Sequence, residues 1–350
     1  MTAKTHQVRI LLIGLGNLGR RFAGLISTKH DQLMERYGLD LRLVGVADSR
    51  GAAIDPQGLD GAEIERWKEA GKPVSSLAGS GRPGMTGLEL IETVEADILC
   101  EAGPVNFGQD AEPGLSHVRT ALQKGLHVAT PNKGPIVLAY RELLGLAKQY
   151  GVRLRFDGTV AGGLPALDLG QRDLRGADIL AIESVPNLTT GYILDMLADG
   201  VSWNDALEQA RDAGALEADP TWDLDGWDAA SKLAILANAV LGLDVTIHEI
   251  ERTGITELSP EWLRTERSEG RLVRLVASAR RDEQGAYGLC VEPRSLPSDH
   301  PFAHLGQKQM AVLYETDLFG TIVSSIDEQT PLPSAATMLR DLLAIMLERK

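Results

Sequence analysis

The feature that most constrains the fold is an apolar run that meets three glycines near the start of the chain. VRILLI (residues 8–13) leads into GLGNLG (residues 14–19). An apolar run of this kind predicts a strand buried on both faces, and residues 20–26 have the pattern of a following helix. The segment therefore has the order strand, glycine turn, helix.

This order gives each glycine a distinct task. The first permits the tight turn, the second lets the backbone approach a pyrophosphate, and the third allows the helix to pack closely on the sheet. The helix N-terminus adds positive potential. An ordinary glycine turn is the alternative, but the context favours a dinucleotide-binding loop. Its cofactor contacts are predicted at Gly14, Gly16, Asn17, Leu18 and Gly19.

Strands and helices alternate over the first 155 residues. Further strands are expected at 41–47, 96–100, 126–129 and 152–156, and helices at 117–124 and 140–150. This alternation predicts an open parallel sheet with helices on both faces. Residues 51–87 are rich in Gly, Pro, Ser and Asp, so we expect a surface excursion there with a short helix at 63–70.

The second half of the chain has a different pattern. We expect longer helices at 206–213 and 229–241 and strands at 271–277, 287–291 and 310–314. The predicted fold class is α/β, a Rossmann-type doubly wound parallel sheet followed by an α+β substrate and dimerisation domain. The expected domains are 1–155 for the cofactor, 156–325 for substrate and dimerisation, and 326–350 for a helix that returns to the cofactor domain.

The second strand ends at Asp48, where an acid is placed to bind the adenosine ribose hydroxyls and favour NAD. Ser49 and Arg50 follow, and Arg50 is equally placed to hold the 2′-phosphate of NADP. The choice between NAD and NADP stays open, with a weak preference for NAD.

Charge and cysteine content exclude several kinds of protein. The net charge of −14 argues against nucleic acid or an anionic membrane as partner, because both attract basic patches. Two cysteines, Cys100 and Cys290, make neither a disulfide framework nor a thiolate metal site. The N-terminal segment lacks a secretory pattern, so a cytoplasmic location is expected.

Acidic residues crowd into the segment ALEADPTWDLDGWDAASK (residues 215–232). A calcium loop does not fit, because its first and last positions would be Thr221 and Lys232, and both positions need acids. Trp222 and Trp227 interleave with the acids, and an apolar helix follows at once. This pattern favours a partly buried pocket wall over a solvated acidic face.

Asp228 and Lys232 are four residues apart, so on a helix they lie on one face. An ion pair at the helix start is one interpretation. The other is a lysine whose proton is poised by burial and an adjacent carboxylate for exchange with a substrate hydroxyl. A second lysine, Lys133, follows a strand at the carboxyl edge of the sheet, where doubly wound folds bind ligands.

Several motifs together resemble the homoserine dehydrogenase family. They are GLGNLG, HVATPNKGPI, TVAGGLP, NLTTGYIL, LEADPTWDLDGWDAASKLAIL and, more weakly, HPFAHLGQKQMAVLYETDLFG. They occur in the family's order and span nearly the whole chain, in the manner of the short form without a regulatory domain. The resemblance implies interconversion of L-homoserine and L-aspartate 4-semialdehyde by hydride transfer with NAD or NADP, in a homodimer.

The resemblance also implies roles for individual residues. Lys133 and Lys232 would flank the reacting oxygen, with Lys232 as the proton donor and acceptor and Asp228 orienting it. Substrate contacts would come from Glu217, Asp223, Thr189, Thr190 and Gly163. Asn106 and Asn132 would lie near the nicotinamide ribose. Backbone carbonyls of Asp157, Val160 and Gly162 would hold a monovalent cation.

Three positions and one segment depart from the family's pattern. Leu188 and Gly191 replace a glycine and an asparagine, and Ala215 replaces an aromatic residue. IDEQT (residues 326–330) stands where the family has a glycine-rich run beside the cofactor. These changes leave two alternatives open: a related dehydrogenase for a different, larger hydroxy compound, and a non-catalytic NAD-binding sensor.

Overall fold

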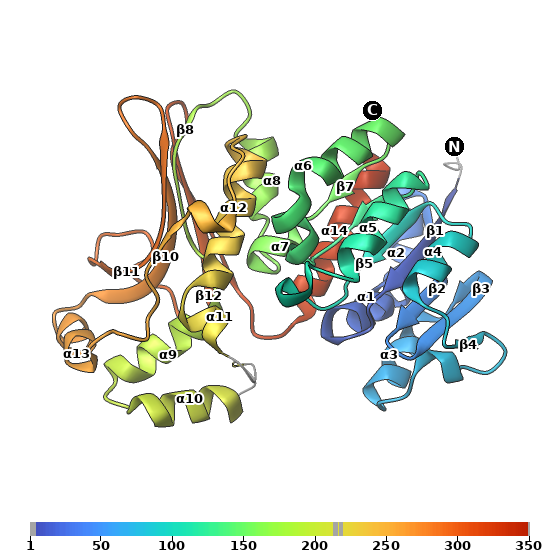
Figure 1. Ribbon diagram of the computed structural model, residues 1–350, viewed down its shortest axis with the longest axis horizontal. Coiled ribbons are helices and arrows are strands. Elements are labelled where there is room, and N and C mark those ends of the chain that lie inside the picture. Colours follow the sequence, from blue (N-terminus) through green and yellow to red (C-terminus); the bar gives the residue numbers. More distant parts are fainter. Residues whose placement is uncertain (1–4, 213–215, 217–219, 349–350) are drawn as a thin grey trace. The chain divides into compact units, whose positions relative to one another are not determined.

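The computed structural model describes residues 5–212, 216 and 220–348. The chain divides into two compact units, and each contains its own sheet (Figure 1). The first unit comprises residues 1–163 and 330–350, and the second comprises residues 164–329. Within the described residues no helix is long and apolar enough to cross a membrane.

The first unit is built on a seven-stranded sheet in the order β4-β3-β2-β1-β5-β6-β7. The pairs from β2 through β1, β5 and β6 to β7 are parallel, whereas β3 and β4 are antiparallel additions at one edge. The predicted doubly wound, mostly parallel sheet is confirmed. The strands are β1 (His6–Ile13), β2 (Leu39–Asp48), β3 (Gly51–Leu59), β4 (Gly81–Pro83), β5 (Ile98–Glu101), β6 (His127–Ala129) and β7 (Leu154–Arg155).

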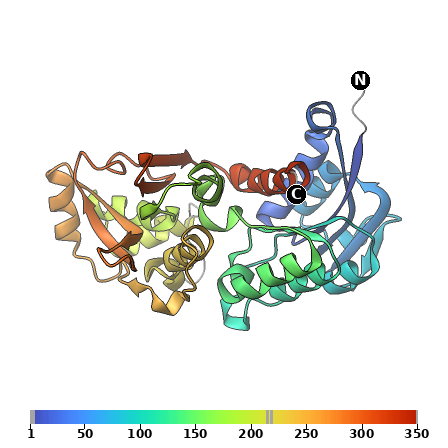
Figure 2. The same ribbon diagram turned by 90° about the horizontal axis from the view of Figure 1, so that it is seen from above.

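Helices cover both faces of this sheet. Figure 2 shows α1 and α14 on one face and α5 and α6 on the other. The helical segments of the unit are α1 (Asn17–Thr28), α2 (His30–Tyr37), α3 (Gly61–Glu69), η1 (Val74–Ser76), α4 (Gly87–Thr93), η2 (Phe107–Gln109), α5 (Gly114–Gln123), α6 (Lys133–Tyr150), α7 (Gly158–Ala161) and α14 (Leu332–Leu347).

The last helix, α14, belongs to the core of the first unit. Its side chains Met338, Leu342 and Ile345 are buried in the same apolar cluster as Ile10 of β1 and Phe22 of α1. The burial of these apolar faces holds the returning helix in place although some 170 residues separate it from the rest of the unit.

The expectation of a surface excursion at residues 51–87 is wrong, although the short helix expected within it at 63–70 is confirmed as α3. The chain turns at Gly51, whose φ of 138° is a conformation that glycine adopts readily and other residues rarely do. Strand β3 then pairs antiparallel with β2. Ala52 and Ala53 are fully buried in that pairing. Two small apolar residues in a stretch rich in glycine and proline give too weak an alternation to reveal a strand.

The second unit is built on a six-stranded sheet in the order β13-β12-β8-β10-β11-β9. Its pairs are antiparallel except β9–β11. The strands are β8 (Ile179–Val185), β9 (Glu251–Arg252), β10 (Leu272–Arg281), β11 (Tyr287–Leu296), β12 (Gln309–Thr316) and β13 (Gly320–Asp327). The helical segments are α8 (Ala166–Asp168), η3 (Leu169–Asp173), α9 (Leu188–Ala198), α10 (Trp203–Asp212), α11 (Thr221–Leu224), α12 (Trp227–Val240), η4 (Ile247–Glu249) and α13 (Pro260–Ser268).

Helices α9, α12 and α13 pack on β10 of this sheet. The central strand β8, which sequence analysis did not predict, carries ILAIESV with both faces largely buried and so lacks a clean alternation. Immediately after β8, Pro186 and Asn187 lead into α9. This junction lies beside the start of α12 and positions the polar residues described next.

Candidate active site

The glycine loop of the first unit has the geometry of a dinucleotide site. A Cβ at Gly14 would lie 2.3 Å from the carbonyl carbon of Ala102, and one at Gly19 would lie 1.8 Å from the Gly14 carbonyl oxygen. A Cβ at Gly16 would meet nothing within 4 Å. Helix α1 begins at the next residue with no side-chain cap. Two glycines are therefore required by packing, whereas the space above Gly16 and the helix N-terminus suit a phosphate.

Asp48, at the end of β2, is already hydrogen-bonded. Its Oδ2 accepts from Lys68 Nζ at 2.6 Å and from the Val74 amide at 3.1 Å, and its Oδ1 accepts from the Arg50 amide at 2.8 Å. Burial by itself raises the pKa of Asp48, but these donors outweigh it and the pKa lies below its usual value. The predicted contact between Asp48 and the cofactor ribose stays a prediction, as do those of Ser49 and Arg50.

Lys68 was not found by sequence reasoning. It lies in α3, within the stretch expected to be an excursion, and only the tertiary fold brings its ammonium to Asp48 at the end of β2. The consequence is a neutralised carboxylate where the sequence suggested a free one.

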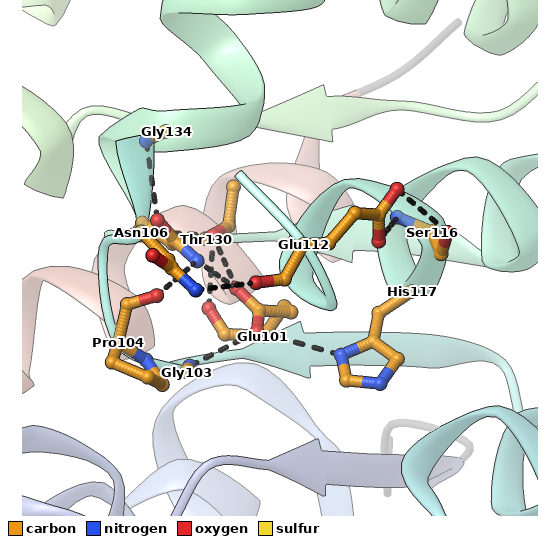
Figure 3. A network of polar contacts seen from close by, with 10 residues as sticks. Glu101, Gly103, Pro104, Asn106, Glu112, Ser116, His117, Thr130 and Gly134 are labelled. Carbon is orange, nitrogen blue, oxygen red and sulfur yellow. Dashed lines mark hydrogen bonds and ion pairs between the residues drawn. The ribbon is translucent and has the colours of Figure 1, made fainter. Parts of the chain in front are cut away.

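Asn132 and Lys133 lie at the junction of β6 and α6. Asn132 is the N-cap of α6, since its Oδ1 accepts from the Gly134 amide at 3.1 Å, and Lys133 is the first residue of the helix. The Nδ2 of Asn132 donates to Oε2 of Glu101 at 3.0 Å. Asn106 is hydrogen-bonded within its own loop, to the Glu112 carbonyl at 3.1 Å. Figure 3 shows this network around the end of β5.

The loop predicted to hold a monovalent cation is tied to α14 instead. Arg340 donates to the Gly163 carbonyl at 3.1 Å and to the Asp157 carboxylate, and Thr337 Oγ1 donates to the Gly162 carbonyl at 2.9 Å. The Arg340 guanidinium therefore supplies a positive charge at this loop. The Gly162 carbonyl, one of the three predicted ligands, accepts a hydrogen bond from the Thr337 hydroxyl. The predicted cation at the backbone carbonyls of Asp157, Val160 and Gly162 stays a prediction.

In the second unit, Lys232 and Asp228 form the predicted pair on α12. Lys232 Nζ lies 2.8 Å from Asp228 Oδ2 and donates to the Pro186 carbonyl at 2.6 Å. The Asp228 residue is 4% exposed, and the Lys232 side chain is 15% exposed. The ion pair and the hydrogen bond hold the ammonium in place and leave at least one of its three N–H groups for another acceptor. A lysine held in this way is suited to deliver a proton.

Asn187 connects this pair to a second carboxylate. Its Nδ2 donates to Asp228 Oδ2 and to Asp223 Oδ1, both at 2.7 Å, while its Oδ1 accepts from the Thr190 amide at 3.0 Å. Thr190 is buried and Thr189 is half-buried at the same turn. Asn187 was not among the site residues expected from the sequence, where its only signal is that of an asparagine at the N-cap of a helix.

Two tryptophans line the segment between the acids. Trp222 and Trp227 are stacked with ring centroids 5.7 Å apart, and the Arg252 guanidinium lies 3.8 Å from the centre of the Trp227 ring. Both rings are half-buried, as expected for a pocket wall. Ala215, Glu217 and Asp219, to which the sequence assigned pocket roles, lie outside the described residues.

Two of the departures from the family pattern have structural contexts. A Cβ at Gly191 would lie 3.6 Å from Nε of Arg274, a buried residue whose guanidinium pairs with Asp195 at 2.9 Å. A longer side chain at residue 191 would press on that guanidinium. Ile326 and Asp327 continue the edge strand β13, paired with β12.

A dinucleotide loop on a parallel sheet, with a lysine–carboxylate pair on a second unit, defines an NAD(P)-dependent dehydrogenase. The homoserine dehydrogenase NAD-binding domain family matches residues 14–157, and the homoserine dehydrogenase family matches residues 165–343. The chain belongs to the homoserine dehydrogenase family. It is accordingly an oxidoreductase that acts on a CH–OH group of a small amino-acid substrate.

Individual relatives cover nearly the full chain. It is 34% identical to a homoserine dehydrogenase of Methanocaldococcus jannaschii over 96% of this chain and 98% of the relative. It is 33% identical to an NAD(+)-dependent homoserine dehydrogenase of Pseudomonas canavaninivorans, over 97% and 96%. Among solved structures, a hyperthermophilic archaeal homoserine dehydrogenase in complex with NADPH matches with a TM-score of 0.85 at 29% identity, over 99% of both chains.

Proposed function

We propose that this enzyme interconverts L-homoserine and L-aspartate 4-semialdehyde, with Lys232 as the proton donor and acceptor. The observation that carries the proposal is the fixed position of the Lys232 ammonium between Asp228 Oδ2 and the Pro186 carbonyl. When bound, the nicotinamide cofactor would supply hydride transfer at the carbon that bears the reacting oxygen. In reduction, Lys232 gives a proton to that oxygen as it becomes a hydroxyl, and in oxidation the neutral amine takes the proton back.

The family's pattern and, for Asp223, the contact with Asn187 support the other predicted roles. Asp223, held by Asn187, has a carboxylate oxygen suited to a substrate ammonium, and Thr189 and Thr190 line the same turn. Lys133 is proposed to stabilise the reacting oxygen together with Lys232, and Gly163 and Glu217 to contact the substrate. The first unit would bind the cofactor and the second the substrate.

The nicotinamide cofactor is NAD or NADP, and the chain's own residues support both. The residues Asn17, Leu18 and Gly19 form the first turn of α1 beyond the open space at Gly16, where the pyrophosphate would lie. Lys68 neutralises Asp48, which removes the repulsion that a free carboxylate would exert on a 2′-phosphate. We therefore expect a smaller preference for NAD over NADP than the presence of Asp48 suggests.

A homodimer and a cytoplasmic location are proposed as well. The strands after residue 245 would form the dimer interface, as the family pattern suggests. Both Cys100 and Cys290 are free thiols, which agrees with a reducing compartment.

The test measures the oxidation of L-homoserine in mildly alkaline buffer through the absorbance of the NADH that forms. The assay is repeated with NADP as cofactor, and with the variants Lys232→Ala and Lys232→Arg. Both variants should lose at least about 100-fold in kcat, because arginine keeps the charge but does not exchange its proton. If the wild type binds NAD tightly by calorimetry but does not turn over homoserine, the assignment of homoserine as substrate is overturned. The two alternatives are then a dehydrogenase for a larger hydroxy compound and a non-catalytic NAD-binding sensor. Near-normal turnover by Lys232→Arg would overturn the proton role.

A further inference from the structure

A buried carboxylate of the first unit, not among the predicted site residues, contacts Asn132, the residue that precedes Lys133. Glu101 is the last residue of β5 and is 0% exposed. A charge in such a place is costly unless donors surround it. Its Oε1 accepts from the Gly103 amide at 3.0 Å and its Oε2 from Asn132 Nδ2 at 3.0 Å. The His117 ring, also buried, approaches Oε1 at 3.7 Å (Figure 3).

The carboxylate decides which way the Asn132 amide points. One end of that amide meets Glu101 and the other meets the Gly134 amide, which offers only a hydrogen. Because a carboxylate accepts and does not donate, the NH2 end must face Glu101. The oxygen is then left for the N-terminus of α6, where a cap needs an acceptor. A flipped amide would lose both bonds at once.

Lys133 lies between the two residues that this arrangement holds, Asn132 and Gly134. The surroundings leave little freedom: a Cβ at Gly114 would lie 2.6 Å from Asn132 Nδ2, and one at Gly103 would lie 2.5 Å from Glu101 Oε1. The backbone N–H of Asn132 also donates to Thr130 Oγ1 at 3.0 Å. The backbone from which the Lys133 side chain projects is therefore set by contacts that converge on Glu101.

We propose that Glu101 is a positioning residue, which orients the Asn132 amide and thereby fixes the start of α6 and Lys133 for the reaction. This rests on the proposed role of Lys133. It also changes the interpretation of Asn132, because a side chain whose two ends are both used inside the protein serves the helix rather than the nicotinamide ribose.

The experiment exchanges the two partners. In Glu101→Gln the new amide cannot accept from both Gly103 and Asn132, so we expect kcat to fall about 10- to 100-fold, as when a supporting contact of a reactive group is lost. KM for homoserine and the NAD dissociation constant should change little. In Glu101→Gln/Asn132→Asp, the glutamine can donate to the aspartate, accept from Gly103, and leave an aspartate oxygen for Gly134. This double variant should recover most of the lost kcat.

A matched control is Glu112→Gln, the same change on a neighbouring carboxylate that accepts from Ser116 and does not contact Asn132 (Figure 3). Its kcat should equal that of the wild type. Equal losses in Glu101→Gln and the double variant would overturn the proposal, because the charge of Glu101 and not the orientation of Asn132 would then matter. If Glu101→Gln alone fails to fold, recovery of a folded, active double variant still decides the question.

A double-mutant cycle with Lys133→Ala separates this proposal from the proposed function. If Glu101 acts through Lys133, Glu101→Gln should lower kcat no further in the Lys133→Ala background. A full additional loss there would overturn the positioning role. Wild-type activity of Lys133→Ala itself would instead overturn the role of Lys133.

Discussion

Asn187 donates to the carboxylates of Asp223 and Asp228 at 2.7 Å each, and so joins two acids whose like charges would otherwise repel. Because Asp228 also holds Lys232, the position of the proposed proton donor depends on a residue from a different segment of the chain, at the start of α9. The acids, the asparagine and the lysine form one hydrogen-bonded group.

Replacement of Asn187 by serine should distinguish its two roles, the bridge between the two acids and the N-cap of α9. Serine can still accept from the Thr190 amide as an N-cap, so the free energy of unfolding should fall by only about 1 kcal/mol. The bridge between the two acids is lost, and we expect kcat to fall about 10- to 100-fold. Steady-state kinetics and urea unfolding measure the two effects. A large loss of stability with unchanged kcat per folded molecule would contradict the bridging role.

Alanine at Gly16 should affect cofactor binding more than the fold. The added Cβ meets nothing within 4 Å in the protein, although the φ of −74° and ψ of −149° at this residue lie outside the regions that alanine prefers. We expect a small fall in Tm and clearly weaker NAD binding by calorimetry, because the methyl group would occupy the space of the pyrophosphate. Gly14→Ala is the control, and its φ of 88° and its 2.3 Å contact with Ala102 predict a lower Tm. Unchanged NAD affinity in Gly16→Ala would place the pyrophosphate elsewhere.

Lys68→Met should make stability depend on pH in a defined direction. The lowered pKa of Asp48 means that its ionised form contributes stability above the unfolded pKa of about 3.9, and that this contribution is lost as pH falls through the folded pKa. Without Lys68, a buried charge is left with weaker partners. We expect a loss of about 3 kcal/mol at pH 7 that shrinks towards pH 4, where protonation removes the charge.

Urea unfolding at the two pH values measures this effect. The exposed Lys72, whose ammonium lies over the Trp67 ring, provides the matched control Lys72→Met. That variant should lose little stability at either pH. A loss in Lys68→Met that is equal at pH 7 and pH 4 would mean that packing of the lysine stem, and not its charge, supports Asp48.

We expect that the enzyme does not depend on monovalent cations, because Arg340 supplies a positive charge at the loop where a cation would bind. The guanidinium already serves the Gly163 carbonyl and the Asp157 carboxylate, so Tm and kcat should be the same in sodium, potassium or tetramethylammonium chloride at equal ionic strength. Arg340→Met leaves the buried Asp157 without its cationic partner and should lower stability by about 3–5 kcal/mol. Adding Asp157→Asn should restore part of that loss. A Tm that rises specifically with sodium or potassium would show that the loop binds an ion after all.

Local signals in the sequence predicted the repeating parts of this structure well. The GLGNLG loop, the strands β1, β2, β5 and β6 and the spacing of Asp228 and Lys232 all rest on contacts between near neighbours, where periodicity and turn chemistry operate. The edge strands β3 and β4 and the central strand β8 were not predicted, since composition or two-sided burial obscures their alternation.

The sequence by itself determined the doubly wound sheet, the cofactor loop and the family, because these depend on short motifs in a set order. Only the tertiary structure decided which charged groups are already paired: Lys68 with Asp48, Arg340 with Asp157, and Asn132 with Glu101. The members of these pairs are between 20 and 183 residues apart. No local pattern specifies such a pair, since it forms only when packing of the apolar faces brings distant segments together.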